Sequence, residues 1–272
     1  MSGQSGSINP IASILLYSGF VLGAFITFKG YQWFRLKRII ENMPKSKIRS
    51  IAMGLVEIYG KVKPYGDNVL ISPIGKQNCI YYASMIDRLI KIRERGRIRE
   101  EWRSAYVKMK MVPYFKIYDE TGEVLVKTEG SKGLMRTIKL NPSDYKEGLN
   151  LEAVKKIIED DNEMPKVMKI LMAGADGTDK FRYYEIAVKP EDNLYVIGDA
   201  GRNPFVESGA AQKSEEAIMI SKGKHENIFY ISEKDEAGVI KKLKRDSLLG
   251  ISIGVIVMVI SLTIILIKLG LF

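Results

Sequence analysis

The chain has 272 residues, of which 42 are lysine or arginine and 32 are acidic, and its formal net charge is +10. A single cysteine, Cys79, and a single histidine, His225, exclude an intrachain disulfide and a structural zinc site, which needs three or four such ligands. Neither G-x-G-x-x-G nor the Walker-type G-x-x-x-x-G-K-[ST] motif occurs. We therefore expect no cofactor, no metal and no catalytic residue.

The first apolar segment lies at residues 11–28, after a short N-terminal segment of residues 1–10, and no charged side chain occurs before Lys29. A membrane-spanning helix needs about 20 apolar residues, because roughly 30 Å of hydrocarbon is crossed at about 1.5 Å per residue. A cleaved signal peptide is the alternative. It is disfavoured because the leader has no lysine or arginine and no small-residue cleavage site. We predict a retained transmembrane helix whose leader is not cytoplasmic.

A second uncharged segment, residues 248–268, is predicted to span the membrane near the C-terminus. Lysines and arginines resist translocation, so they accumulate on the cytoplasmic side of a span. They are dense in a basic amphipathic segment, 29–49, and in a second basic segment, 241–247. The interfacial cations are Lys29, Arg35, Lys37, Arg38, Lys241, Lys242, Lys244 and Arg245. This pattern predicts a two-pass protein of the cell membrane with a cytoplasmic soluble domain.

The same two basic segments account for the net charge, since the rest of the chain is close to neutral. A basic protein ordinarily suggests nucleic acid as a partner. Here, however, the cations lie beside a membrane, whose anionic lipids attract them. We therefore predict membrane lipids as partners and no nucleic acid.

Each predicted span contains two glycines four residues apart, Gly19 with Gly23 and Gly250 with Gly254. Such pairs let two helix backbones approach closely, so they predict packing of the two spans on each other. Contact between copies in a homo-oligomer is one alternative. The ordinary abundance of glycine in membrane helices is the other.

Residues 50–240, between the spans, are predicted to form one soluble domain. Short runs rich in Val, Ile and Tyr, separated by Gly and Pro, are typical of strands. We predict strands at 55–63, 68–72, 79–88, 105–110, 114–118, 123–127, 182–188, 193–197 and 227–232. A helical insertion at 150–174 contains a helix capped by Asn150 and a second helix near Pro165. Helices and strands do not alternate, so the prediction is an α+β fold, a β-rich barrel-like domain with a small helical insertion, flanked by two transmembrane helices.

Two polar stretches of this domain are expected to be solvated. Residues 199–227 are rich in glycine and charge, which predicts a mobile loop with a short strand at 218–220. The acidic residues at 159–163 are typical of an exposed helix junction. Cys79 is different, because it precedes IYY in a predicted strand. It is interpreted as a buried structural thiol, since no nearby histidine is available to activate it.

The most distinctive local pattern is RLIKIRERGRIREEWR at residues 88–103. Five successive cations in the middle of this string all fall on odd positions, namely Lys91, Arg93, Arg95, Arg97 and Arg99. Isoleucines fall on even positions, so a hairpin turning near Gly96 is predicted to have a cationic face backed by an apolar one. One interpretation is a surface for lipid headgroups or an acidic partner. The other is a solvated edge whose charge prevents aggregation.

Five strings follow one another in the order known from one family, namely SIAMGLVEIYGKV, LISPIGKQNCIYY, PYFKIYDETGEVLV, RYYEIAVKPEDNLYVIGDA and FYISEKDEAGVIKKLKR. Together with Trp102 they resemble the GIDE-type, or "beside a membrane", domain, best known from the mitochondrial outer-membrane E3 ubiquitin ligase family. The similarity covers roughly residues 50–245, and the chain resembles a prokaryotic, archaeal or bacterial, relative. The matching positions are Gly60, Ser72, Pro73, Cys79, Tyr82, Trp102, Asp119, Gly122, Tyr184, Glu185 and Gly198. The resemblance leaves open whether they are structural or binding residues.

The ligase branch of that family carries a zinc-binding RING after its second span, whereas no cysteine follows Cys79 here. The resemblance implies ubiquitin transfer for the family, but the residues that perform it are missing from this sequence. We therefore expect a membrane-tethered, non-catalytic binding or sensory module whose further partner is another membrane or cytoplasmic protein. A ligase-family enzyme and a scaffold that oligomerises through its glycines are the alternatives.

Overall fold

The computed structural model describes residues 10–43, 46–94, 96–133, 144–163, 175, 178–206, 214–223 and 228–268. It divides into two compact units, one formed by the terminal segments 1–44 and 234–272 and the other by residues 45–233. The predicted helix near Pro165, together with Arg95 and His225, lies outside the described residues.

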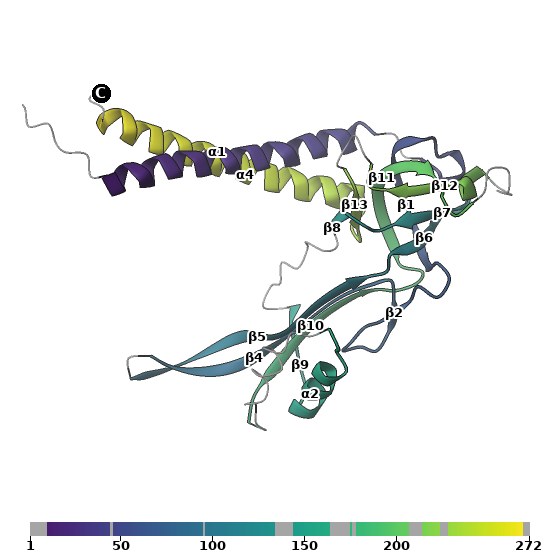
Figure 1. The fold of residues 1–272 in the computed structure, drawn as a ribbon, viewed down its shortest axis with the longest axis horizontal. Coiled ribbons are helices and arrows are strands. Elements are labelled where there is room, and N and C mark those ends of the chain that lie inside the picture. Colours follow the sequence, from purple (N-terminus) through teal and green to yellow (C-terminus); the bar gives the residue numbers. More distant parts are fainter. Residues whose placement is uncertain are drawn as a thin grey trace, which may run out of the picture. The chain divides into compact units, whose positions relative to one another are not determined.

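The terminal unit consists of two long helices, α1 (Pro10–Glu41) and α4 (Glu236–Lys268), which pack along each other (Figure 1). α1 continues unbroken from the first predicted span through most of the basic segment that follows it. Among the described residues, one helix is long and apolar enough to cross a membrane, over Glu236–Ile267, judged by length and composition. α4 therefore contains the second predicted span and the basic residues before it.

Glycines lie where α1 and α4 meet. A Cβ atom added to Gly23 would lie 2.8 Å from the Met258 side chain and 2.9 Å from the carbonyl oxygen of Gly254. Gly254 in turn faces Thr27, whose hydroxyl donates to the Gly23 carbonyl at 2.9 Å. Further close approaches join Gly19 to Ser261 and Gly250 to Gly30. A larger side chain at these positions would push the two helices apart.

The second unit contains a closed five-stranded barrel. Its strands are β1 (Gly54–Pro64), β6 (Tyr114–Tyr118), β7 (Glu123–Lys127), β11 (Asn193–Arg202) and β12 (Ile218–Ser221). Around the barrel they follow the order β1-β6-β7-β12-β11 and return to β1, and only β7 and β12 are parallel. Numbered along the chain, this is the order 1-2-3-5-4-1 of the OB-fold. The predicted α+β, barrel-like fold is thus confirmed.

β1 closes the barrel because it pairs with two strands. Residues 54–61 pair with β11 and residues 61–64 with β6. Gly60 lies next to this change of partner, where an added Cβ would collide with the carbonyl group of Tyr118. Gly198 in β11 is similarly confined, since a Cβ there would lie 2.6 Å from Ile220 and 2.9 Å from Phe229. Gly60 and Gly198, two of the three glycines that match the family pattern, therefore serve barrel packing.

A second sheet is built from the long connections between barrel strands. It contains β4 (Tyr81–Glu94), β5 (Arg97–Met111), β9 (Lys146–Glu147) and β10 (Phe181–Val188), in the order β5-β4-β10-β9. Helix α2 (Leu151–Glu159) packs its buried Val154, Ile157 and Ile158 with residues of this sheet. Asn150 caps the helix as predicted, its side chain accepting from the Ala153 amide at 2.8 Å.

Short elements complete the unit: η1 (Ile48–Ser50), β2 (Leu70–Ile71), β3 (Asn78–Cys79), β8 (Lys132–Gly133), η4 (Ser214–Ala217) and β13 (Tyr230–Ser232). The predicted strands at 114–118 and 123–127 coincide with β6 and β7. The predicted loop at 199–227 begins too early, because β11 continues to Arg202 with Ala200 buried in the barrel. The short strand inside that loop is confirmed by β12.

Candidate functional site

Three aromatic side chains meet at one end of the barrel, and we call them the aromatic face. Tyr65 follows β1, Tyr114 begins β6, and Phe205 lies in the connection from β11 to β12. The ring centroids of Tyr114 and Phe205 are 5.3 Å apart, edge to face, and Tyr65 lies 6.4 Å from each. Phe205 is 54% exposed. In OB-folds, ligands bind on the second and third strands and on these same two connections.

Lysines flank the aromatic face, and a carboxylate neutralises two of them. Lys63 and Lys116 both bind Glu123. Burial alone would raise the pKa of Glu123, but the hydrogen bonds from these two lysines outweigh it and lower the pKa. The Lys116 ammonium also lies 6.0 Å from the ring centroid of Tyr65. This charge balance suits a ligand held by stacking better than a polyanion such as nucleic acid.

Elsewhere, a carboxylate in the second sheet collects four hydrogen bonds. Glu185 accepts from the hydroxyls of Ser72 and Ser84 at 3.1 and 2.7 Å. It also accepts from the amides of Ile74 and Gly75 at 3.0 and 2.7 Å. Because both serines are fully buried, Glu185 is the group that fixes the turn at 72–77 to the sheet.

Five family-pattern positions are gathered in this neighbourhood, namely Ser72, Pro73, Cys79, Tyr82 and Glu185. Cys79 is fully buried, and its thiol lies 3.6 Å from the carbonyl oxygen of Leu70. Burial and, secondarily, the negative charge of Glu185 raise the pKa of the Cys79 thiol to about 11. This environment opposes thiolate formation, so Cys79 is unsuited to act as a nucleophile at neutral pH.

Cys79 in the folded chain is expected to react with iodoacetamide at pH 8 at least about a hundredfold more slowly than in the denatured chain. The reason is that the thiolate is the reacting species and a free thiol has a pKa of about 8.5. Mass spectrometry of the time course measures the rate without ambiguity, because the chain has one cysteine. Equal rates in the two states would contradict this result.

The opposite face of the second sheet holds a stacked arginine. The guanidinium of Arg182 lies 4.5 Å from the Trp102 ring centroid and 4.0 Å from that of Tyr145. It donates to Asp87 from Nε and Nη2 at 3.1 and 2.9 Å, and Ser104 donates to the same carboxylate at 2.9 Å. The guanidinium of Arg182 is thus occupied by a carboxylate and two aromatic rings, so it supports the sheet instead of offering an anion site. The ring of Tyr184, another position that matches the family pattern, is tilted against that of Tyr145, with the ring centroids 6.3 Å apart.

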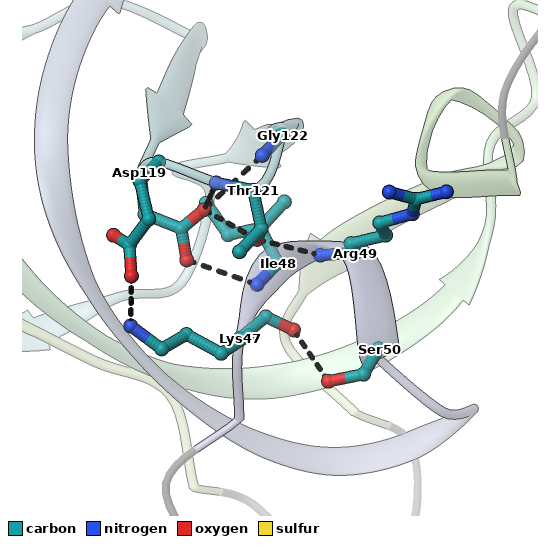
Figure 2. Close-up of polar contacts among 8 residues, drawn as sticks. Lys47, Ile48, Arg49, Ser50, Asp119, Thr121 and Gly122 are labelled. Carbon is teal, nitrogen blue, oxygen red and sulfur yellow. Dashed lines mark hydrogen bonds and ion pairs between the residues drawn. The ribbon is translucent and has the colours of Figure 1, made fainter.

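Asp119 and Gly122 occupy the turn between β6 and β7, which Figure 2 shows against the 47–50 segment. Asp119 accepts from the Thr121 hydroxyl and amide at 2.6 and 2.7 Å and from the amides of Gly122 and Ile48 at 3.1 Å. Burial would raise the pKa of Asp119, but these hydrogen bonds outweigh it and lower the pKa. The turn therefore fastens the segment that precedes β1 to the barrel.

Asp119→Asn is expected to lower the free energy of unfolding by about 1 kcal/mol at pH 7, since bonds to a charged acceptor are strong but the site is partly solvated. The folded pKa of Asp119 lies below its unfolded value of about 3.9. Its stabilisation is therefore fully present above that value and is lost as the pH falls through the folded pKa. Chemical denaturation between pH 7 and 2 should show that the difference in free energy of unfolding between the variant and the parent shrinks in acid. A difference that stays constant over this pH range would contradict the prediction. Asp67→Asn, in an exposed turn, is the control.

The basic hairpin turns at Gly96 as predicted, but its predicted cationic face is wrong. Glu94 pairs with Arg97 across a two-residue turn in which Gly96 has a φ of 81°. Facing residues of β4 and β5 therefore have numbers of opposite parity, so odd-numbered residues of the two strands point to opposite faces. Lys91 and Arg93 share one face, and Arg97 and Arg99 lie on the other.

The acidic junction after α2 also differs from expectation. Asp161 is only 8% exposed, where the sequence pattern predicted a solvated residue. It accepts from Lys108 at 2.5 Å and from the Tyr106 hydroxyl at 3.2 Å. Burial would raise the pKa of Asp161, but the bond from Lys108 and its other partners lower it. The pairing joins residues more than fifty positions apart, which the local pattern does not reveal.

The predicted interfacial cations lie on the two long helices, Lys29, Arg35, Lys37 and Arg38 on α1 and Lys241, Lys242, Lys244 and Arg245 on α4. Lys29 lies 5.5 Å from the Phe25 ring centroid and Arg38 5.4 Å from that of Phe34. Lys37 pairs with Glu41 at 2.8 Å. Alternating cations and aromatic rings are typical of helix segments at a membrane interface.

No family model, curated protein or solved structure matches the chain. Within the described ranges, no group of three His, Cys, Asp or Glu residues is placed to hold a metal ion. The aromatic face is therefore the candidate binding site on geometric grounds. Sequence reasoning missed it because its three rings come from chain positions that only the barrel topology brings together. Each ring directly follows a proline, namely Pro64, Pro113 or Pro204, but nothing in the sequence indicates that the three positions meet.

Proposed function

We propose that the chain is a membrane-tethered, non-catalytic binding module of the GIDE type. The observation that carries the proposal is that α4 follows β13 directly along the chain. One chain therefore combines a barrel whose topology is used for ligand binding with an apolar helix long enough to span a membrane. α4 supplies the tether. The barrel supplies the recognition surface.

The proposal includes a second span at residues 11–28 and a cytoplasmic domain. The glycine contacts between α1 and α4 support it, because close packing through small residues is how membrane helices associate. The cations that follow residues 11–28 and precede residues 248–268 support the orientation. Since the glycines already serve contact between α1 and α4, a homo-oligomer built on the same faces would require the two helices to separate.

Protease protection tests the topology. In sealed, right-side-out vesicles of the expressing cells, we expect the domain between the spans to resist added protease until the membrane is opened with detergent. Inside-out vesicles should show immediate cleavage of the same domain. Cleavage in intact right-side-out vesicles would overturn the cytoplasmic orientation.

Photo-cross-linking tests the binding role of the aromatic face. A photoreactive side chain placed at Phe205 is expected to capture one defined membrane or cytoplasmic protein in native membranes. Placed at Tyr59, which is 51% exposed elsewhere on the barrel, it should not capture that protein. Tyr114→Ala should abolish capture at Phe205. Equal capture from both positions would reject the aromatic face, and ubiquitin transfer by the purified chain would reject a non-catalytic role.

A further inference from the structure

We propose that the tip of the β4–β5 hairpin inserts into the anionic headgroup layer of the bilayer that holds α4. This inference rests on the proposed membrane tether. The hairpin tip is defined as residues 91–99.

The hairpin extends beyond the rest of its sheet as a two-stranded ribbon (Figure 1). β10 pairs with β4 only over Tyr81–Arg88, whereas β4 and β5 remain paired to Glu94 and Arg97. At about 3.4 Å per residue, the six residues of β4 beyond Arg88 make the unsupported ribbon roughly 20 Å long. A lone two-stranded ribbon gains little stability of its own in water, so its length calls for another explanation.

The tip is strongly cationic. Residues 91–99 contain five cations and one carboxylate. At the base of the hairpin Arg88 pairs with Asp179 and Arg103 pairs with Glu101. By contrast, no ion pair in the described part of the chain involves Lys91, Arg93, Arg97 or Arg99, and all four are exposed. These charges are therefore available to an external anion.

The arrangement of the charges favours a membrane over an acidic protein. The register places Lys91 and Arg93 on one face of the ribbon and Arg97 and Arg99 on the other. A protein partner docks on one face and would leave the other pair of cations unused. A headgroup layer surrounds an inserted tip, so cations on both faces contact anionic lipid.

Exposure of Ile98 distinguishes membrane insertion from the alternative interpretation, a solvated edge whose charge only prevents aggregation. It lies at the tip and is 69% exposed, more than any other large apolar side chain among the described residues. Charge alone would protect an edge from aggregation, and an exposed isoleucine works against that purpose. An apolar side chain ringed by cations is the composition of segments that enter the membrane interface.

A fluorescent probe on the full chain tests the inference. In a Cys79→Ala background, Ile98→Cys carries an environment-sensitive dye, and the protein is reconstituted in nanodiscs of neutral lipid or with roughly one third anionic lipid. We expect about twofold higher, blue-shifted emission with anionic lipid, reversed in about 0.5 M salt, where charges are screened beyond a few Å. Arg97→Gln/Arg99→Gln should remove at least about half of the increase.

Two further label positions separate the possible failures. A label at Ile256→Cys, on an exposed side chain of α4, should report a lipid environment in both kinds of nanodisc. A label at Tyr59→Cys on the barrel should respond to neither. A lipid-like signal at position 256 without a response at 98 would overturn this inference and leave the tether intact. A water-like signal at 256 would overturn the tether itself. A response at 98 that is equal in both lipids, or that appears only when separate anionic vesicles are added, would also overturn the inference.

Discussion

Replacing Glu185 with alanine is expected to destabilise the soluble domain by about 3 kcal/mol, because four hydrogen-bond donors lose their acceptor at once. Two of the donors are the hydroxyls of Ser72 and Ser84, both fully buried. The other two are backbone amides in the turn at 74–75. Each buried donor left unsatisfied costs roughly 1–3 kcal/mol, and water entering from the exposed side of the turn recovers part of this.

Glu185→Gln separates the loss of the carboxylate from the loss of volume. Oε1 accepts from the Ile74 amide and Oε2 from the Gly75 amide, so both orientations of a glutamine place its NH₂ group against a backbone N–H. A hydroxyl can rotate to accommodate this, but an amide cannot. We expect Glu185→Gln to cost about 1–2 kcal/mol.

Chemical unfolding followed by tryptophan fluorescence measures both variants. The chain has two tryptophans, so Trp33→Phe leaves Trp102, which lies in the same sheet as Glu185, as the reporter. Glu147→Gln is the matched control, an exposed glutamate on β9, the strand beside β10. If Glu185→Ala unfolds at the denaturant concentration of the parent, Glu185 does not hold the turn.

The second large effect is expected for Asp87→Leu, which should cost about 3 kcal/mol. Asp87 is 4% exposed and binds the Arg182 guanidinium through two hydrogen bonds. Removing one partner of a buried ion pair leaves the other charge uncompensated, which costs roughly 3–5 kcal/mol. We expect a cost at the lower end of this range because the Arg182 side chain is 21% exposed, so water can partly solvate its unpaired charge. Trp102 emission should also change, since the guanidinium stacked on its ring loses its anchor.

The double variant Asp87→Leu/Arg182→Leu provides the internal test. Replacing a buried pair by apolar side chains is often close to neutral, so the double variant should recover most of the lost stability. Arg103→Leu is the control, since its pair with Glu101 is exposed and should contribute less than about 1 kcal/mol. A double variant no more stable than Asp87→Leu would show that the stacking of Arg182 matters more than its charge.

The sequence by itself determined the elements whose signals are local. Alternating apolar residues around a turn-forming DETG sufficed for the hairpin of β6 and β7, because both strands and their connection lie within fifteen residues. Asn150 and the spacing of Val154, Ile157 and Ile158 sufficed for α2. An uncharged run of spanning length sufficed for the apolar part of α4.

The tertiary structure decided the features that depend on register or on contacts distant along the chain. The two-residue turn between Glu94 and Arg97 sets a register in which odd-numbered residues of β4 near the turn face even-numbered residues of β5. The cations predicted to share one face are therefore divided between the two faces of the hairpin. The pairing of β1 with both β6 and β11 closed the barrel, and only this closure brings Tyr65, Tyr114 and Phe205 together. Such outcomes depend on which strands meet and in what alignment. A one-residue change in alignment exchanges the two faces of a strand without altering its composition.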